Sequence, residues 1–211
     1  SFCIYFIVMK RANVFGIKFR DNAKALERAN GCSSLWNVIN YKRRQSFFAG
    51  DIDMTYKDEY KAFAPSIGAT TAQQVIRKNT AAWRCFFKLL KLLKAGELPP
   101  NIKKVGPPGY WKDRDTGKLV PRMLIRADEY KIKGRSLKMS KKFRARIFGN
   151  LKWTGKQGLL QVQYDQQTQK WHAYMPVTVQ APPKPISHAI SAYVDIGVRY
   201  PITAGHDGCT K

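Results

Sequence analysis

Acidic residues are scarce in this chain of 211 residues. It contains 14 Asp and Glu against 38 Lys and Arg, which leaves a formal net charge of +24. A surface that only needs to stay soluble carries both signs of charge, so solubility is a weak explanation for this excess. A polyanionic partner explains it better, and because no lipid-type amphipathic segment is present, nucleic acid is favoured over a membrane.

Cysteine and histidine are also few and scattered. The four cysteines stand at positions 3, 32, 85 and 209 without a C-x-x-C pair. Zinc ligation and a disulfide framework are therefore not indicated, and a reducing cytosol fits this usage. The three histidines, His172, His188 and His206, form no Cys/His or Ser/His/Asp grouping.

Long apolar runs are missing as well. Residues 1–8 are apolar, but no basic segment precedes them and no small-residue cleavage site follows. They do not resemble a signal peptide and are too short to span a bilayer. They are either an octet translated upstream of a true start at Met9 or an N-terminal edge strand. We expect no membrane partner and a cytoplasmic location.

The apolar fraction of 44% is sufficient for a folded core, and the first half of the chain is expected to be largely helical. Residues 12–19 alternate as a strand. Asp21 or Asn22 is expected to cap a helix over 23–29, which Gly31 separates from a second helix over 33–49. That second helix is expected to turn Lys42, Arg43 and Arg44 toward solvent. A short helix is expected over 55–63.

The clearest helix begins at a capping-box pattern, Thr71 with Gln74, and ends at Gly96. Its apolar residues recur at helical spacing on one face. No acid lies between Pro65 and Glu97, so the cations opposite that face have no local partner. Phosphate contact is therefore preferred to simple solvation for Arg77, Arg84, Lys88 and Lys91.

Residues 98–156 hold 17 Lys and Arg and 4 acids. Short alternating runs there, followed by a hairpin around 166–170, predict an all-β unit consistent with a small barrel. Exposed aromatic side chains among cations stack bases in nucleic-acid-binding proteins. Trp153 and Trp171 are more readily interpreted as core residues. The candidates for binding in this stretch are Lys103, Lys104, Tyr110 and Trp111.

Residues 192–198 form a short apolar run that predicts a buried strand carrying Asp195, with Gly197 leaving space beside it. Burying a carboxylate is costly unless it has a partner. A hard divalent cation or a backbone N–H in a structural turn would serve, and the motif alone leaves both open.

The order of these parts resembles the N-terminal part of TnpB, also called OrfB, a transposon-encoded relative of compact type V CRISPR effectors. The resemblance covers nearly the whole chain. It is carried by Trp36-Asn37 and Tyr41, by residues 82–88 (AWRCFFK), by the basic proline-containing loop, and most specifically by residues 193–198 with 202–208 beyond them.

The resemblance implies an α+β fold in which a helical recognition lobe is inserted into a small wedge β-barrel, followed by the first strands of a RuvC-like domain of RNase H fold. The expected segments are 1–20 (first wedge strand), 21–98 (recognition lobe), 99–185 (remaining wedge) and 186–211 (nuclease start).

The resemblance also implies a function. Guide RNA and target DNA would be the partners, and Asp195 would be a catalytic Mg²⁺ ligand of an RNA-guided DNA endonuclease. The family uses a further Glu and Asp, and only Asp207 follows among the 13 residues after Val198. We therefore expect the chain by itself to be catalytically incomplete, as a truncated member or a cut piece. The alternatives are a stand-alone basic RNA-binding protein and a ribosomal-type structural protein.

Overall fold

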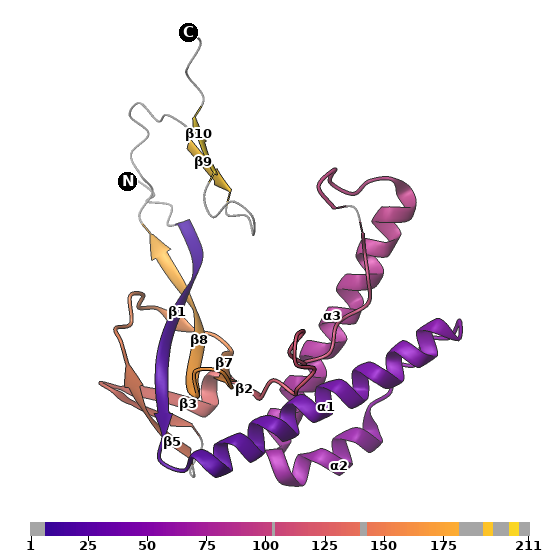
Figure 1. Cartoon of the computed structure of the whole chain (residues 1–211). Helices are drawn as coiled ribbons and strands as arrows, with labels where there is room; N and C mark the ends of the chain where they lie inside the picture. The colour runs from indigo at the N-terminus through magenta and orange to yellow at the C-terminus, as the bar shows by residue number, and fades with distance from the viewer. Residues whose placement is uncertain (1–6, 103, 140–142, 182–191, 196–202, 207–211) are drawn as a thin grey trace, which may run out of the picture. The chain divides into compact units, whose positions relative to one another are not determined.

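The computed structural model describes residues 7–102, 104–139, 143–181, 192–195 and 203–206. One compact unit spans Met9–Val179, and the short strands β9 (Ala192–Asp195) and β10 (Thr203–His206) belong to a second. The first unit combines helices with an antiparallel sheet, so the expected α+β class is confirmed (Figure 1).

Three helices follow the first strand in the described part of the chain: α1 (Asn22–Phe48), α2 (Lys57–Ile67) and α3 (Ala69–Ala95). Asp21 caps α1, as predicted, by accepting a hydrogen bond from the Lys24 amide at 3.0 Å. The predicted break at Gly31 is wrong, because α1 is continuous through it. A Cβ at this position would lie 2.5 Å from Cγ2 of Ile67, so glycine permits the close approach of α2.

The third helix starts differently from the prediction. The capping box is wrong, because α3 begins at Ala69 after Gly68, and the buried Thr71 hydroxyl accepts a hydrogen bond from Arg28 at 2.8 Å. The predicted end is confirmed: Gly96 adopts a left-handed conformation and its N–H bonds back to Leu92 and Leu93. Helix α2 begins two residues after the predicted start at 55 and ends four residues after the predicted end at 63.

The sheet is built from strands on both sides of the helical segment in the sequence. Its path is β2-β7-β8-β1-β5-β4-β3, with β6 paired to β8. No ladder joins β2 to β3 among the described residues, so the sheet is open and the expected closed barrel is not confirmed. The bounds are β1 (Ile7–Phe19), β2 (Arg122–Ile125), β3 (Tyr130–Lys133), β4 (Ser136–Met139), β5 (Phe143–Phe148), β6 (Lys156–Gln157), β7 (Leu160–Asp165) and β8 (Lys170–Ala181).

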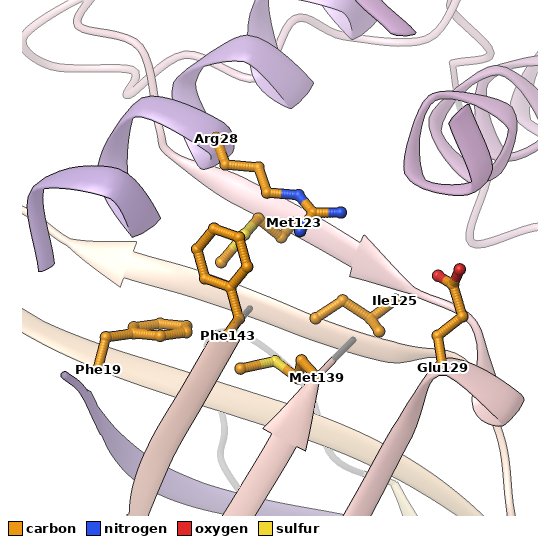
Figure 2. A pocket seen from close by; sticks show the side chains of 7 residues that line it. All are labelled: Phe19, Arg28, Met123, Ile125, Glu129, Met139 and Phe143. Atoms are coloured by element: carbon orange, nitrogen blue, oxygen red, sulfur yellow. The ribbon is translucent and has the colours of Figure 1, made fainter. Parts of the chain in front are cut away.

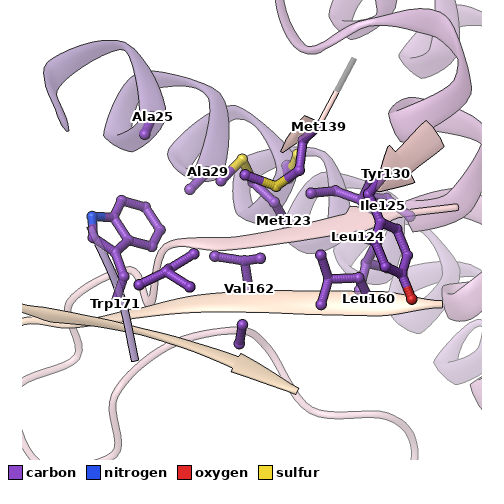
Figure 3. Packing of buried hydrophobic residues seen from close by; sticks show 14 of the residues in the cluster. Ala25, Ala29, Met123, Leu124, Ile125, Tyr130, Met139, Leu160, Val162 and Trp171 are labelled. Carbon is purple, nitrogen blue, oxygen red and sulfur yellow. The ribbon is translucent and has the colours of Figure 1, made fainter. Parts of the chain in front are cut away.

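The two ends of the sheet share one core. A 3₁₀ turn (Ala127–Glu129) joins β2 to β3, and the buried Met123 and Met139 belong to the same apolar cluster as Trp171 and Ala29 (Figure 3). Trp171 is therefore a core residue, as predicted. Tyr130 of β3 lies in the same core, and its hydroxyl donates a hydrogen bond to the Gly158 carbonyl at 2.9 Å. Its burial raises the pKa of the hydroxyl to about 12.

Hydrogen bonds between neutral groups join α1 to α3 and to the segment that leads into β2. The amide of Asn40 in α1 donates to the Pro108 carbonyl at 2.8 Å and accepts from the Trp83 indole of α3 at 2.9 Å. The Ser33 hydroxyl donates to the Val120 carbonyl at 2.7 Å and accepts from the Arg122 amide at 3.0 Å. The loop before β2 is thereby fixed along α1.

We expect Asn40→Ala to lower the free energy of unfolding by about 2–3 kcal/mol, because it leaves the buried Trp83 indole and the Pro108 carbonyl without their partner. Urea denaturation followed by circular dichroism measures this. Asn30→Ala, on the exposed side of the same helix, is the control and should change stability by less than about 0.5 kcal/mol. Equal effects of the two substitutions would contradict the assigned role of Asn40.

Candidate nucleic-acid interface

Four exposed cations run along α3, on the side away from its buried Trp83 and Phe86. The predicted solvent-facing row is therefore present. The ion pairs found among the described residues involve Lys42 and Arg126 only, so none of the four has a carboxylate partner there. This α3 stripe consists of Arg77, Arg84, Lys88 and Lys91.

The cations predicted to face solvent on α1 are instead engaged within the protein. Arg43 is only 2% exposed and donates hydrogen bonds to Asn79 at 2.6 Å and to Thr80 and the Met54 carbonyl at 3.1 Å. The prediction for Arg43 is wrong because it lies four residues after Ile39, on the buried face of the helix. Burial lowers the pKa of its guanidinium.

Its two neighbours are half-buried. Lys42 forms ion pairs with Asp53 and Glu59, each at 3.4 Å. Arg44 donates to the Pro108 carbonyl at 3.0 Å, and its guanidinium lies 5.4 Å from the centre of the Tyr110 ring. Both side chains hold neighbouring segments in place, but only the charge of Lys42 is balanced by carboxylates.

The aromatic candidates separate in the same way. Tyr110 is 36% exposed, between Arg44 and Lys112, and remains available for stacking. Trp111 is only 6% exposed because its ring stacks on Trp36 at 4.5 Å, so its predicted exposure is wrong.

Trp153 departs from its expected place in the core. It is 38% exposed, with the Arg11 guanidinium 5.2 Å from its ring. Of the two predicted lysines, Lys104 is exposed and Lys103 lies outside the described residues.

A second basic surface was missed in the sequence. On the outward side of β1, β5, β4 and β3, the register places Lys18 opposite Arg146, and Lys138 opposite both Arg144 and Lys131. The outward positions of these four strands that the structure describes carry no acid. The sequence pattern that would have predicted it is the alternation of cations with apolar residues in β3, β4 and β5. We call these exposed cations the basic sheet face: Lys18, Lys131, Lys133, Lys138, Arg144 and Arg146.

Like charges that face each other across a ladder destabilise a sheet. The basic sheet face therefore opposes folding and is poorly explained as a stabilising feature. An anion bound along it would relieve the repulsion.

A groove with a volume of about 550 Å³ adjoins this face and is lined by residues of β1 and of the neighbouring strands β5 and β8. Lys18, Lys170 and His172 line it together with the ring of Phe148, which is 48% exposed. Arg146 lies 5.8 Å from the centre of that ring. The groove thus combines an aromatic surface with cations, the pairing that binds unstacked bases and their phosphates.

The interior cavity of Figure 2 is not a ligand site. Its volume is about 10 Å³, enough for a single water at most. Arg28 closes it, with its guanidinium 4.9 Å from the Phe143 ring and donating to Thr71. Arg28 thereby joins α1 to α3 and to the sheet.

The predicted metal ligand lies in the second unit. The predicted strand is confirmed over Ala192–Asp195, and Thr203 of β10 lies opposite Asp195 in the ladder. Residues 196–198 lie outside the described residues, and the side chain of Asp195 is not described either. Where side chains are described, no three His, Cys, Asp or Glu residues gather as metal ligands.

The fold and its surface define a mixed α+β protein whose outward cations far outnumber the acids that could pair with them. No protein-family model matches the chain. It is 43% identical over 153 residues to the TnpB-like protein ORF457 of Acidianus two-tailed virus. The chain belongs to the TnpB/OrfB family, as its resemblance indicated. The match covers 70% of this chain and 33% of the viral protein, so the chain spans well under two thirds of its relative.

Of the helices that the structure describes, none has both the length and the apolar character that crossing a bilayer requires.

We expect Lys138→Gln to raise the melting temperature by about 1–2 °C at low salt, because it removes a charge that Arg144 and Lys131 repel. Differential scanning calorimetry at low and high salt measures this, and salt should abolish the gain. Lys118→Gln is the matched control, since Lys118 shares a groove with the carboxylates of Asp113 and Asp165. A loss of stability in Lys138→Gln would contradict the assigned repulsion.

Proposed function

We propose that this chain is the nucleic-acid-gripping part of a TnpB-type RNA-guided DNA endonuclease, with guide RNA and target DNA as its partners. The observation that carries the proposal is the exposed cationic surface without acids on α3 and on the sheet. Nucleic acid supplies the regular row of negative charges that such a surface matches.

The spacing of the α3 stripe suits a nucleic-acid backbone. At 1.5 Å per residue, Arg77 and Lys91 are separated by about 21 Å along the helix axis. Cations spaced over that length on a helix can follow the shape and charge of a duplex, while base pairing between guide and target reads its sequence. The helical segment inserted between β1 and β2 would act as the recognition lobe, and the sheet would act as the wedge domain.

Asp195 is proposed as the first metal-binding carboxylate of a RuvC-like domain that begins with β9 and β10. Mg²⁺ bound there would polarise the scissile phosphate and activate a water. The residues of this chain contribute one carboxylate, and the remaining ligands would come from the rest of the nuclease. The part of this chain is then to hold the nucleic acid, with Asp195 oriented by its strand.

We expect Arg84→Ala and Lys88→Ala each to reduce the slope of log Kd for RNA against log salt by about one unit, because each removes one phosphate contact. Fluorescence anisotropy with a labelled RNA duplex from 50 to 300 mM salt measures the slope. Lys118→Ala is the control, because Lys118 lies outside the α3 stripe and lines a groove together with Asp113 and Asp165. Slopes equal to that of the control would show that the α3 stripe only faces water.

In the complete gene product, we expect Asp195→Ala to abolish Mg²⁺-dependent DNA cleavage and to leave RNA affinity within about twofold, because the carboxylate binds metal and not the guide. Cleavage of plasmid DNA and RNA anisotropy separate the two effects. Undiminished cleavage would contradict the assignment of Asp195. RNA binding by the complete product without any cleavage would favour the stand-alone RNA-binding protein.

A further inference from the structure

Lys78 and Arg122 lie near each other where α3 packs against β2, the strand at the end of the sheet that pairs with β7. Lys78 projects from α3, and its ammonium donates to the side-chain carbonyl of Gln161 on β7 at 2.6 Å. Arg122 is the first residue of β2, and its guanidinium lies 5.4 Å from the centre of the Trp111 ring. That ring is itself stacked on Trp36, so both charges stand on fixed supports.

Neither charge is balanced by the protein. The structure gives neither residue an ion pair with any carboxylate among the described residues. The partner of Lys78 is a neutral amide, and the Nε of Arg122 is buried without a hydrogen-bond partner. Arg43 also has a buried Nε without a hydrogen-bond partner, but its other guanidinium nitrogens donate to three oxygens of neighbouring residues.

The cost of this arrangement appears in the acid–base equilibria of both groups. Burial lowers the pKa of Lys78, and the nearby charge of Arg122 lowers it further. Burial also lowers the pKa of the Arg122 guanidinium, against a small opposing influence of Tyr174. Two half-buried like charges without a counter-ion destabilise the free protein, and a bound anion would reverse that effect.

We propose that Lys78 and Arg122 together bind one phosphate of the nucleic-acid backbone at the junction of α3 and the sheet. A guanidinium presents two parallel N–H groups to phosphate oxygens, and an ammonium adds a point charge beside them. Arg77 of the α3 stripe is the preceding residue, which makes the site continuous with a surface suited to a backbone. This inference rests on the proposed function and adds to it a contact that joins the helices to the sheet.

The test compares Lys78→Gln, Arg122→Gln and the double variant with Lys118→Gln as a control. In RNA anisotropy, the double variant should lower the salt slope by about one unit, because only one phosphate is lost. In thermal unfolding without RNA, 50 mM inorganic phosphate should raise the melting temperature of the unsubstituted protein by about 2–4 °C relative to chloride at equal ionic strength. The double variant should lose that gain.

Each outcome decides a different point. If the protein binds RNA and the double variant keeps the control's slope, this inference is overturned while the proposed function stands. If phosphate protects but the RNA slope is unchanged, the site binds free phosphate and its assignment to the nucleic-acid backbone is wrong. If the protein binds no RNA, the proposed function fails. Lower stability of the double variant in chloride with an unchanged phosphate gain would show a packing role and overturn the site.

Discussion

Electrostatic repulsion across the outward face of the sheet is the constraint on which this structure depends. Lys138 on β4 faces a cation on each neighbouring strand: Arg144 on β5 and Lys131 on β3. The outward positions that the structure describes on these strands carry no acid. The inward positions of the same strands are mostly apolar and packed into the core, so the strands cannot turn their cations inward. Burial of the core must therefore exceed this repulsion until an anion arrives.

Neutral groups make several of the hydrogen bonds that join the helices to the sheet and to the loop before β2, beside charged contacts such as that of Lys78 with Gln161. Asn37, Asn40 and Ser33 of α1 hydrogen-bond to the backbone of the loop before β2. The stacked pair of Trp36 and Trp111 adds apolar contact at the same junction. Few cations form ion pairs among the described residues: Lys42 pairs with Asp53 and Glu59 where α1 meets α2 and the segment before it, and Arg126 pairs with Asp128 in the turn between β2 and β3.

Local patterns predicted the elements that depend on local chemistry. The Asp21 cap, the end of α3 at Gly96 and the β7–β8 hairpin follow from capping, left-handed glycine and alternation. Gly31, Arg43 and Trp111 were misjudged because their environments come from segments distant in the chain: Ile67, Asn79 and Trp36. The basic sheet face could have been predicted from strand alternation alone. The proximity of Lys78 and Arg122 could not, because it depends on how α3 packs on β2.

Mapping where RNA touches the protein tests most directly whether the unpaired cations of α3 and of the basic sheet face bind nucleic acid. Ultraviolet cross-linking of a bound RNA duplex, followed by mass spectrometry of the linked peptides, reports the contacted segments. We predict cross-links in peptides from α3 and from β3, β4 and β5, where the unpaired cations lie. Cross-links confined to other segments, with none in these elements, would contradict this prediction.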